Sequence, residues 1–167
     1  MTLGSQLYEE SSGWGIARIA GVLSGERFPT GTRAALKRFS PGEHVPIEFY
    51  SFAYRYLPDG WEKSMDAWAT IVAGIAMMSP NAHNPQVRYG QALAEKRYSE
   101  ARMERLLQAE GQVQRILFLR SIRFLTQKSA SFNWTDGASF ILTQNRDKRE
   151  SLNSRIARDY YSKVDKE

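Results

Sequence analysis

The sequence predicts an all-α protein, and three observations carry this prediction. Apolar residues repeat at three- and four-residue steps in nearly every segment, which is the period of a buried helix face. No segment shows the strict alternation of apolar and polar residues that is typical of a half-buried strand. Proline and glycine residues divide the chain into pieces of helix length. We therefore expect a compact multi-helix bundle.

The first half of the chain predicts four helices. One lies within residues 14–23, and a second runs from about Thr30 to the turn at 40–42. A third has Pro46 in its first turn, where a proline costs no hydrogen bond, and ends before the turn at 58–60. A long fourth helix begins near Trp61 and is marked by apolar residues at helical spacing: Trp61, Met65, Trp68, Val72, Ile75 and Ala76.

The second half follows a loop at 79–86 that contains two prolines. Four further helices are expected there, namely a short one at 91–95, one with Ser99 as its N-cap, one at 112–127 and one at 134–143. Leu152, Ile156 and Tyr160 define an amphipathic last helix. With 167 residues and 42% hydrophobic composition, residues 1–167 are expected to form one all-helical domain. Within it we expect an N-terminal lobe at about 1–80 and a basic C-terminal lobe at about 88–167, joined near 79–87.

The positive charge is concentrated in the second half of the chain. Residues 1–87 carry seven Lys and Arg against eight acids, a net charge of −1, whereas residues 88–167 carry sixteen against ten, a net charge of +6. Eleven of those sixteen cations are arginines. The arginine guanidinium is a permanently charged, planar fork of donors that matches phosphate oxygens, so this bias indicates a polyanionic partner.

The residues for most catalytic and metal chemistry are missing. The chain has no cysteine, and its two histidines, His44 and His83, lie in separate loops without a partner at metal-ligand spacing. No phosphate-binding glycine loop or nucleophile elbow is present. Glu95, Glu100 and Glu104 lie among arginines and are better explained by intrahelical pairing than by a carboxylate site. We expect no enzymatic activity, no catalytic residues, no metal and no cofactor.

The location expected from the sequence is the cytoplasm. The N-terminal residues lack the basic segment and long apolar core of a secretory signal. No apolar run approaches the roughly 20 residues that span a bilayer, so no membrane contact is expected.

The candidate nucleic-acid-binding residues form three basic groups. They are Arg33, Lys37 and Arg38; then Arg102, Arg105, Arg115, Arg120 and Arg123; then Arg146, Lys148 and Arg149. The first group is explained equally well by a solvated helix face. No helix-turn-helix pattern, zinc finger or RNP aromatic signature accompanies them, which favours contacts to the nucleic-acid backbone over contacts to bases.

Several segments together resemble the CasB family, the small subunit of type I-E CRISPR Cascade complexes. The strongest are residues 90–95 (GQALAE), 98–103 (YSEARM) and 105–109 (RLLQA), and residues 32–38, 120–125 and 155–161 agree in order and spacing. The resemblance covers most of residues 30–163 and leaves residues 1–25 unmatched.

This resemblance implies a non-catalytic, all-helical subunit of a guide-RNA ribonucleoprotein that acts in antiviral defence. Its implied partners are the guide crRNA, the target DNA in an R-loop, the large and backbone-forming Cascade subunits, and a second copy of itself. Its implied role is to steady the R-loop and the displaced DNA strand through the three basic groups. The alternative is a helical protein-protein adaptor whose basic face docks acidic surfaces of partner proteins.

Overall fold

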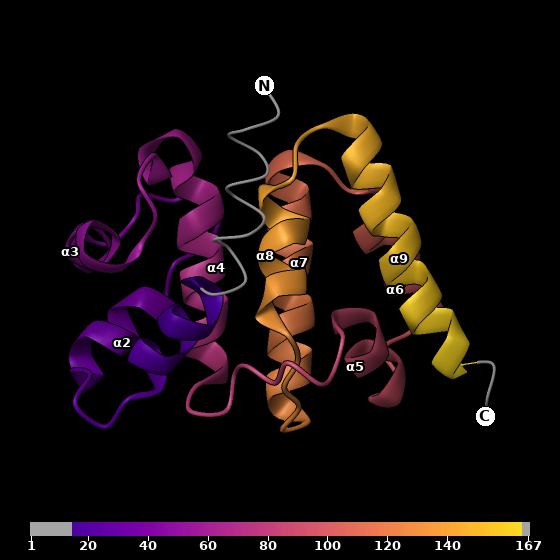
Figure 1. Ribbon diagram of the computed structural model, residues 1–167, viewed down its shortest axis with the longest axis horizontal. Helices are drawn as coiled ribbons and strands as arrows, with labels where there is room; N and C mark the ends of the chain where they lie inside the picture. Colours follow the sequence, from indigo (N-terminus) through magenta and orange to yellow (C-terminus); the bar gives the residue numbers. More distant parts are fainter. Residues whose placement is uncertain (1–14, 165–167) are drawn as a thin grey trace.

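The protein is a bundle of helices. The computed structural model describes residues 15–164, of which residues 15–24 form the first helix. The later helices (Figure 1) are α2 (Thr30–Lys37), α3 (Ile47–Tyr56), the 3-10 helix η1 (Trp61–Ser64), α4 (Met65–Met78), α5 (Tyr89–Glu95), α6 (Glu100–Gln108), α7 (Gly111–Gln127), α8 (Trp134–Leu142) and α9 (Arg146–Val164). The β pairing within residues 15–164 is a single isolated bridge between His83 and Phe132. The predicted all-α class is confirmed.

Local signals in the sequence set the helix boundaries. Helix α2 begins at Thr30, as predicted, and α3 begins directly after Pro46, whose φ of −66° suits the entry to a helix. The Ser99 hydroxyl accepts a hydrogen bond from the Arg102 backbone N–H and so caps α6, as predicted. Asn133 caps α8 in the same way through the backbone N–H of Thr135.

The predicted fourth helix is two elements. Residues from Trp61 to Ser64 form a 3-10 turn, and the α-helix starts only at Met65. Ser64, with φ −132° and ψ 41°, lies outside the helical region and separates the two hydrogen-bond patterns. Trp61 still packs against Phe49 at a ring-centroid distance of 5.7 Å, so the apolar periodicity predicted its packing but not its backbone.

Helix α4 lies at the centre of the bundle. Every residue from Ala67 to Ala76 is buried, which leaves no polar face. It packs against α2 on one side and against α7 and α8 on the other (Figure 1). One continuous cluster of buried side chains therefore extends from residue 16 to residue 160 across both halves of the chain. The division into two lobes near 79–87 stays a prediction.

The C-terminal helix α9 packs on α5, and a polar network joins both to α8. Asp136 of α8 is 4% exposed and accepts from the Tyr89 backbone N–H (3.2 Å), from Arg88 (3.3 Å) and from Arg155 (3.4 Å). The Arg88 Nε also donates to Asp159 at 2.8 Å. The 155–161 segment that resembles a family signature thus supplies two members of a structural network.

None of the helices within residues 15–164 is long and apolar enough to cross a lipid bilayer.

Candidate nucleic-acid interface

Helix α6 has one buried and one exposed side, as its sequence predicts. Met103 and Leu106 are buried in the core, and Arg102 and Arg105 are exposed on the other side. The Arg105 Nε donates to the Ala101 carbonyl one turn earlier at 3.4 Å, so this side chain lies along its own helix.

The Arg102 side chain is held in place before any ligand binds. Its guanidinium lies 4.4 Å from the ring centre of Tyr98 and 5.0 Å from that of Phe124, and its Nε donates to the Ser99 hydroxyl at 3.1 Å. Each cation–π contact at an exposed site contributes about 0.5–1 kcal/mol. Lys128 approaches the Phe124 ring at 5.8 Å. The rings of Tyr98 and Phe124 therefore contact a cation of α6 and a cation at the end of α7.

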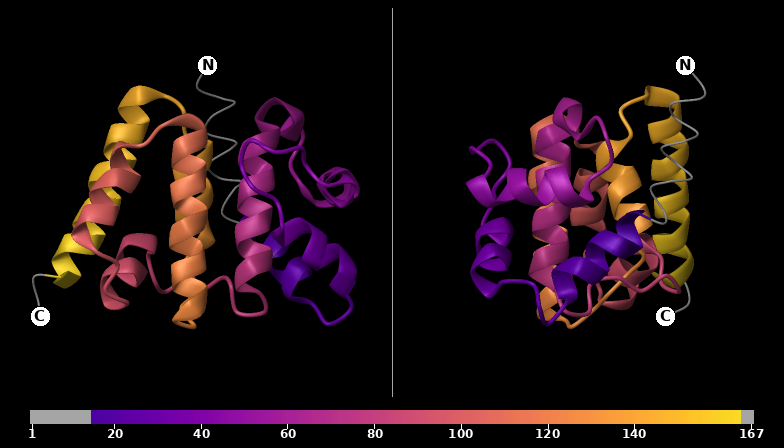
Figure 2. Two further views of the ribbon diagram at one scale, coloured as in Figure 1. Left: turned by 180° about the vertical axis from the view of Figure 1, so that it is seen from behind. Right: turned by 60° about the vertical axis from the view of Figure 1, so that its left-hand side comes forward.

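Helix α7 adds cations next to α6. Arg120 and Arg123 are exposed, and α6 and α7 lie side by side in the view from behind (Figure 2, left). Burial raises the pKa of Tyr98, whereas the nearby positive charges of Arg102, Arg105 and Arg120 act in the opposite direction. We call Arg102, Arg105, Arg120 and Arg123 the α6–α7 cationic surface.

The candidate cations have no acidic partners among the described residues. The ion pairs within residues 15–164 are those that Arg88 forms with Asp136 and Asp159, and the pair between Arg155 and Asp136. Because an exposed guanidinium without a carboxylate has no internal charge to neutralise it, the α6–α7 cationic surface can bind external anions.

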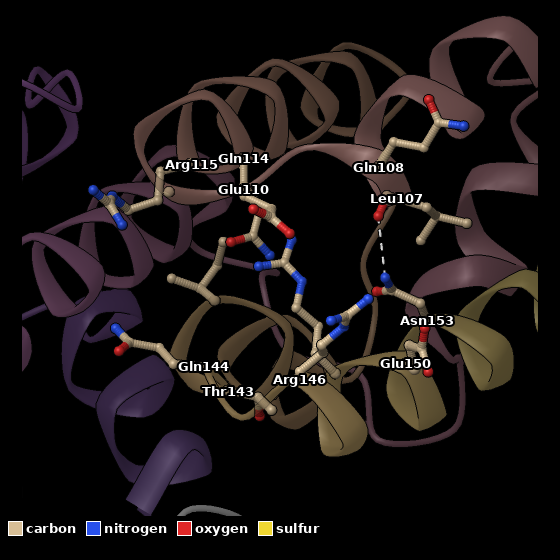
Figure 3. Close-up of a pocket in the computed structure, with 13 residues that line it drawn as sticks. Leu107, Gln108, Glu110, Gln114, Arg115, Thr143, Gln144, Arg146, Glu150 and Asn153 are labelled. Carbon is tan, nitrogen blue, oxygen red and sulfur yellow. Dashed lines mark hydrogen bonds between the residues drawn. The ribbon is translucent and has the colours of Figure 1, made fainter.

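The third basic group borders a cavity at the start of α9. The cavity has a volume of about 630 Å³ and is lined by Arg115, Arg146 and Arg149 together with Glu110 and Glu150. In Figure 3 Glu110, at the N-cap position of α7, and Gln114 of α7 face Arg146 across the cavity. Asn153 donates to the Leu107 carbonyl at 3.1 Å.

Some cations near this cavity make contacts within the protein, and others are exposed. Arg149 donates to the Ala109 carbonyl and lies 5.9 Å from the Phe140 ring, so it connects α9 to the α6–α7 loop. Arg146 and Lys148 are exposed. Arg115, which belongs to the second basic group and also lines the cavity, is half-buried, and its buried Nε has no hydrogen-bond partner among the described residues.

The first basic group lies on α2, away from the other two. Arg33 donates to the carbonyls of Leu23 (2.7 Å) and Gly25 (2.9 Å), so it holds the turn between the first helix and α2. Lys37 and Arg38 are exposed at the end of α2. Because α2 and α6 lie at opposite sides of the bundle (Figure 1), these cations are not part of the α6–α7 cationic surface.

The sequence did not reveal one feature of the interface and one member of the structural network around Asp136. The candidate binding residues do not include Tyr98 or Phe124, yet both rings lie against the Arg102 guanidinium. The four-residue separation of Tyr98 and Arg102 was the available signal, whereas the contact with Phe124 depends on how α6 packs against α7. Arg88 carried no local signal at all, because both its acidic partners are distant in sequence.

His83, Glu95 and Glu100 make structural hydrogen bonds. His83 accepts through Nδ1 from the Trp134 backbone N–H at 3.0 Å. Glu95 accepts from Gln91 at 2.9 Å, and Glu100 accepts from the Tyr161 hydroxyl at 3.2 Å. Within residues 15–164 no three His, Cys, Asp or Glu side chains lie close enough together to hold a metal ion.

A scan against protein-family models matches residues 32–161 to the CRISPR-associated protein Cse2 family. The chain belongs to this family. Cse2 proteins are subunits of the CRISPR Cascade complex, so the resemblance seen in the sequence is confirmed. The matched region contains every candidate cation.

Two solved structures from Thermus thermophilus share the fold of this Cse2-family chain. A Cse2-family CRISPR-associated protein matches with a TM-score of 0.68 at 21% identity, and CasB matches with a TM-score of 0.66 at 23% identity. Each match covers 92% of this chain and 97% of the other. A search of curated proteins found no match.

Proposed function

We propose that this chain is the non-catalytic small subunit of a type I-E CRISPR surveillance complex. In that role it binds the nucleic-acid backbone without sequence specificity and stabilises the R-loop, including the displaced non-target DNA strand. The observation that carries the proposal is the α6–α7 cationic surface, whose four arginines are exposed and unpaired among the described residues.

The geometry suits phosphate binding better than base recognition. Arg102 lies over two rings, so one face of its guanidinium is covered while its edge still carries N–H donors. A side chain that is already held also loses less conformational entropy when it binds a phosphate. Contacts of this kind position a strand but do not read its sequence.

Phosphate contacts at this surface are sufficient for the proposed role. Opening a DNA duplex against a guide RNA is an almost balanced exchange of base pairs. A few arginine contacts to the displaced strand can therefore tip the equilibrium toward the open state. The sequence itself is read by base pairing.

The family membership supports the remaining proposed partners. They are the guide crRNA, the large and backbone-forming subunits, and a second copy of this chain. Within this proposal Lys37, Arg38, Arg146 and Lys148 bind either phosphates or acidic surfaces of these subunits. Arg33 and Arg149 contribute less to binding, since both donate to backbone carbonyls of their own chain.

Fluorescence anisotropy of the purified chain with a labelled single-stranded DNA of mixed sequence tests the proposal. The variant Arg102→Glu/Arg120→Glu/Arg123→Glu should bind at least about tenfold more weakly at low salt, because three phosphate contacts become repulsions. A strand of unrelated sequence should give the same affinities.

The matched control reverses the same number of charges at other exposed positions. The variant Arg27→Glu/Arg55→Glu/Lys63→Glu changes three exposed cations outside the three basic groups and should retain most of the affinity. Equal losses in both variants would show that net charge, not the α6–α7 cationic surface, drives binding. Negligible DNA binding by the unaltered chain, with tight capture of acidic partner proteins, would favour the adaptor.

A further inference from the structure

A second cavity lies in the N-terminal part of the bundle, apart from the three basic groups. It has a volume of about 620 Å³ and lies between the first helix, the turn that follows it, and α3. Its walls include Gly21 of the first helix, Phe28 of the turn, and Phe52 and Tyr56 of α3. We call it the α3 groove.

Aromatic rings form an ordered apolar floor in the α3 groove. Phe28 and Phe52 meet edge to face with ring centres 6.0 Å apart, and Phe52 and Tyr56 lie 5.0 Å apart. Arg33 lies over the Phe28 ring at 5.6 Å and holds the turn that carries it. A floor whose side chains are already packed against each other suits a large apolar side chain.

Gly21 lines the α3 groove. It lies inside the helix at 15–24, where glycine is less stable than alanine because it loses more conformational freedom on folding. A Cβ at this position would meet no described atom within 4 Å, and its backbone has no left-handed φ. Neither packing nor backbone geometry therefore requires a glycine here. Its effect is to leave space along the wall of the groove.

The rim of the α3 groove is positively charged. Arg27 and Arg55 are exposed, and neither pairs with an acid among the described residues. Glu48, which is half-buried, and the hydroxyls of Thr32 and Ser51 complete the polar lining. Two cations against one acid favour a ligand that carries a small number of carboxylates.

The surroundings argue against a nucleic acid as the occupant. Residues 1–87 have a net charge of −1, so this half of the chain provides no general attraction for a polyanion. The groove combines a concave aromatic floor with a short charged rim, which resembles the anchor pocket and polar rim of a protein interface.

We propose that the α3 groove docks a peptide segment of a protein partner that places a large apolar side chain on Phe28, Phe52 and Tyr56 and carboxylates beside Arg27 and Arg55. This site is separate from the α6–α7 cationic surface. The proposal goes beyond the proposed function and rests on Cascade membership only for the choice of the proteins used to test it.

The test fills the α3 groove without disturbing its walls. In the variant Gly21→Leu the new side chain occupies open space, so its thermal midpoint should equal or exceed that of the unaltered chain. When co-expressed with the other protein subunits of its Cascade complex, this variant should be recovered with them at least about tenfold less well. Its affinity for single-stranded DNA should not change. The control Ser154→Leu adds the same side chain at an exposed position of α9 and should assemble normally.

Two further measurements identify the occupant. Arg27→Glu/Arg55→Glu should weaken assembly without filling the groove, which decides the question if Gly21→Leu fails to fold. A photo-crosslinking residue in place of Ser51 should capture a peptide of another subunit that contains a large apolar residue next to Asp or Glu.

The proposal is overturned if both groove variants assemble normally, or if the crosslinks reach nucleic acid or residues 1–14 of the same chain. Its failure is distinguishable from failure of the proposed function. The latter appears as unchanged DNA binding after charge reversal on α6 and α7, whereas the groove variants report on protein assembly.

Discussion

Asp136 shows how one buried carboxylate holds three helices together. It accepts from a backbone N–H at the start of α5, from the guanidinium of Arg88 just before α5, and from that of Arg155 in α9. A buried carboxylate is stable only when its oxygens are paired and hydrogen-bonded. The network therefore holds α5, α8 and α9 together.

We expect Asp136→Ala to lower the free energy of unfolding by about 2–3 kcal/mol, because it leaves two arginines and one buried N–H without their acceptor. The loss stays below that of a fully buried pair, since solvent reaches both guanidinium groups. Urea unfolding measures the change. Asp59→Ala, at an exposed turn position, should change stability by less than about 0.5 kcal/mol. Similar effects of the two substitutions would contradict the role of the network.

His83 makes stability depend on pH. Its Nδ1 accepts the Trp134 backbone N–H at the start of α8, which requires a neutral ring, and burial lowers its pKa below the ordinary 6.5. Between these two pKa values the unfolded chain binds more protons than the folded chain. Stability is therefore lost as the pH falls from about 6.5 through the lower, folded-state pKa.

Thermal unfolding at neutral and mildly acidic pH tests this contribution. The midpoint should fall on acidification, and His83→Asn should fall less, because the amide oxygen can still accept the Trp134 N–H but does not titrate in this range. His44→Asn changes the other histidine, which is exposed in a loop, and serves as the control. An unaltered pH dependence in His83→Asn would disprove the assignment.

At the scale of elements, Gly90 explains the contact between α5 and α9. A Cβ at residue 90 would overlap the Ile156 carbonyl oxygen and lie 3.0 Å from the Tyr160 backbone nitrogen. The two helices can therefore approach this closely only if residue 90 has no side chain. The Tyr160 hydroxyl then reaches the Tyr98 carbonyl at 2.5 Å and joins α9 to the start of the α6–α7 cationic surface.

Substituting two helical glycines separates packing from helix propensity. Gly90→Ala should lower the free energy of unfolding by about 1–3 kcal/mol through overpacking. Gly31→Ala in α2 has open space around its new Cβ and should raise it by about 0.4–1 kcal/mol. Chemical denaturation of both variants measures whether each substitution lowers or raises the free energy of unfolding. A stabilising Gly90→Ala would mean that α5 and α9 are less closely packed.

The elements were largely predictable from the sequence because their boundaries depend on local chemistry. The start of α3 follows from Pro46, and the start of α6 from Ser99. The 3-10 turn before α4 was not predictable, since its apolar spacing is compatible with both kinds of helix.

The candidate site was only partly predictable. The exposed arginines of α6 and α7 follow from helical periodicity, which places them opposite the core residues. Some of the arginines donate hydrogen bonds to backbone carbonyls that are distant in sequence. Arg33 donates to the carbonyls of Leu23 and Gly25, and Arg149 donates to that of Ala109. Such contacts arise only from tertiary packing.

At the scale of the whole molecule, the charge is distributed unequally over the bundle. The α6–α7 cationic surface belongs to residues 88–167, which have a net charge of +6. Lys37 and Arg38 belong to residues 1–87, which have a net charge of −1. A polyanion is drawn by the summed field of a region as well as by single contacts. The two sets of cations should therefore contribute unequally to DNA binding.

The salt dependence of single-stranded DNA binding tests this inequality. Each phosphate contact contributes about 0.7 to the slope of log K against log salt. Arg120→Glu/Arg123→Glu should reduce the steepness by about 1.4, and Lys37→Glu/Arg38→Glu, with the same charge change, by clearly less. Equal reductions would mean that bound strands reach both sides of the bundle.

The position of Arg102 over the rings of Tyr98 and Phe124 has one more consequence. With one face covered by these rings, the guanidinium cannot be sandwiched between two neighbouring bases, and the N–H donors at its edge suit phosphate oxygens. If the surface binds DNA as proposed, its affinity does not depend on the base sequence of the strand. A cell could then acquire any number of new guides against new viruses, and this subunit would serve each of them without a single altered residue.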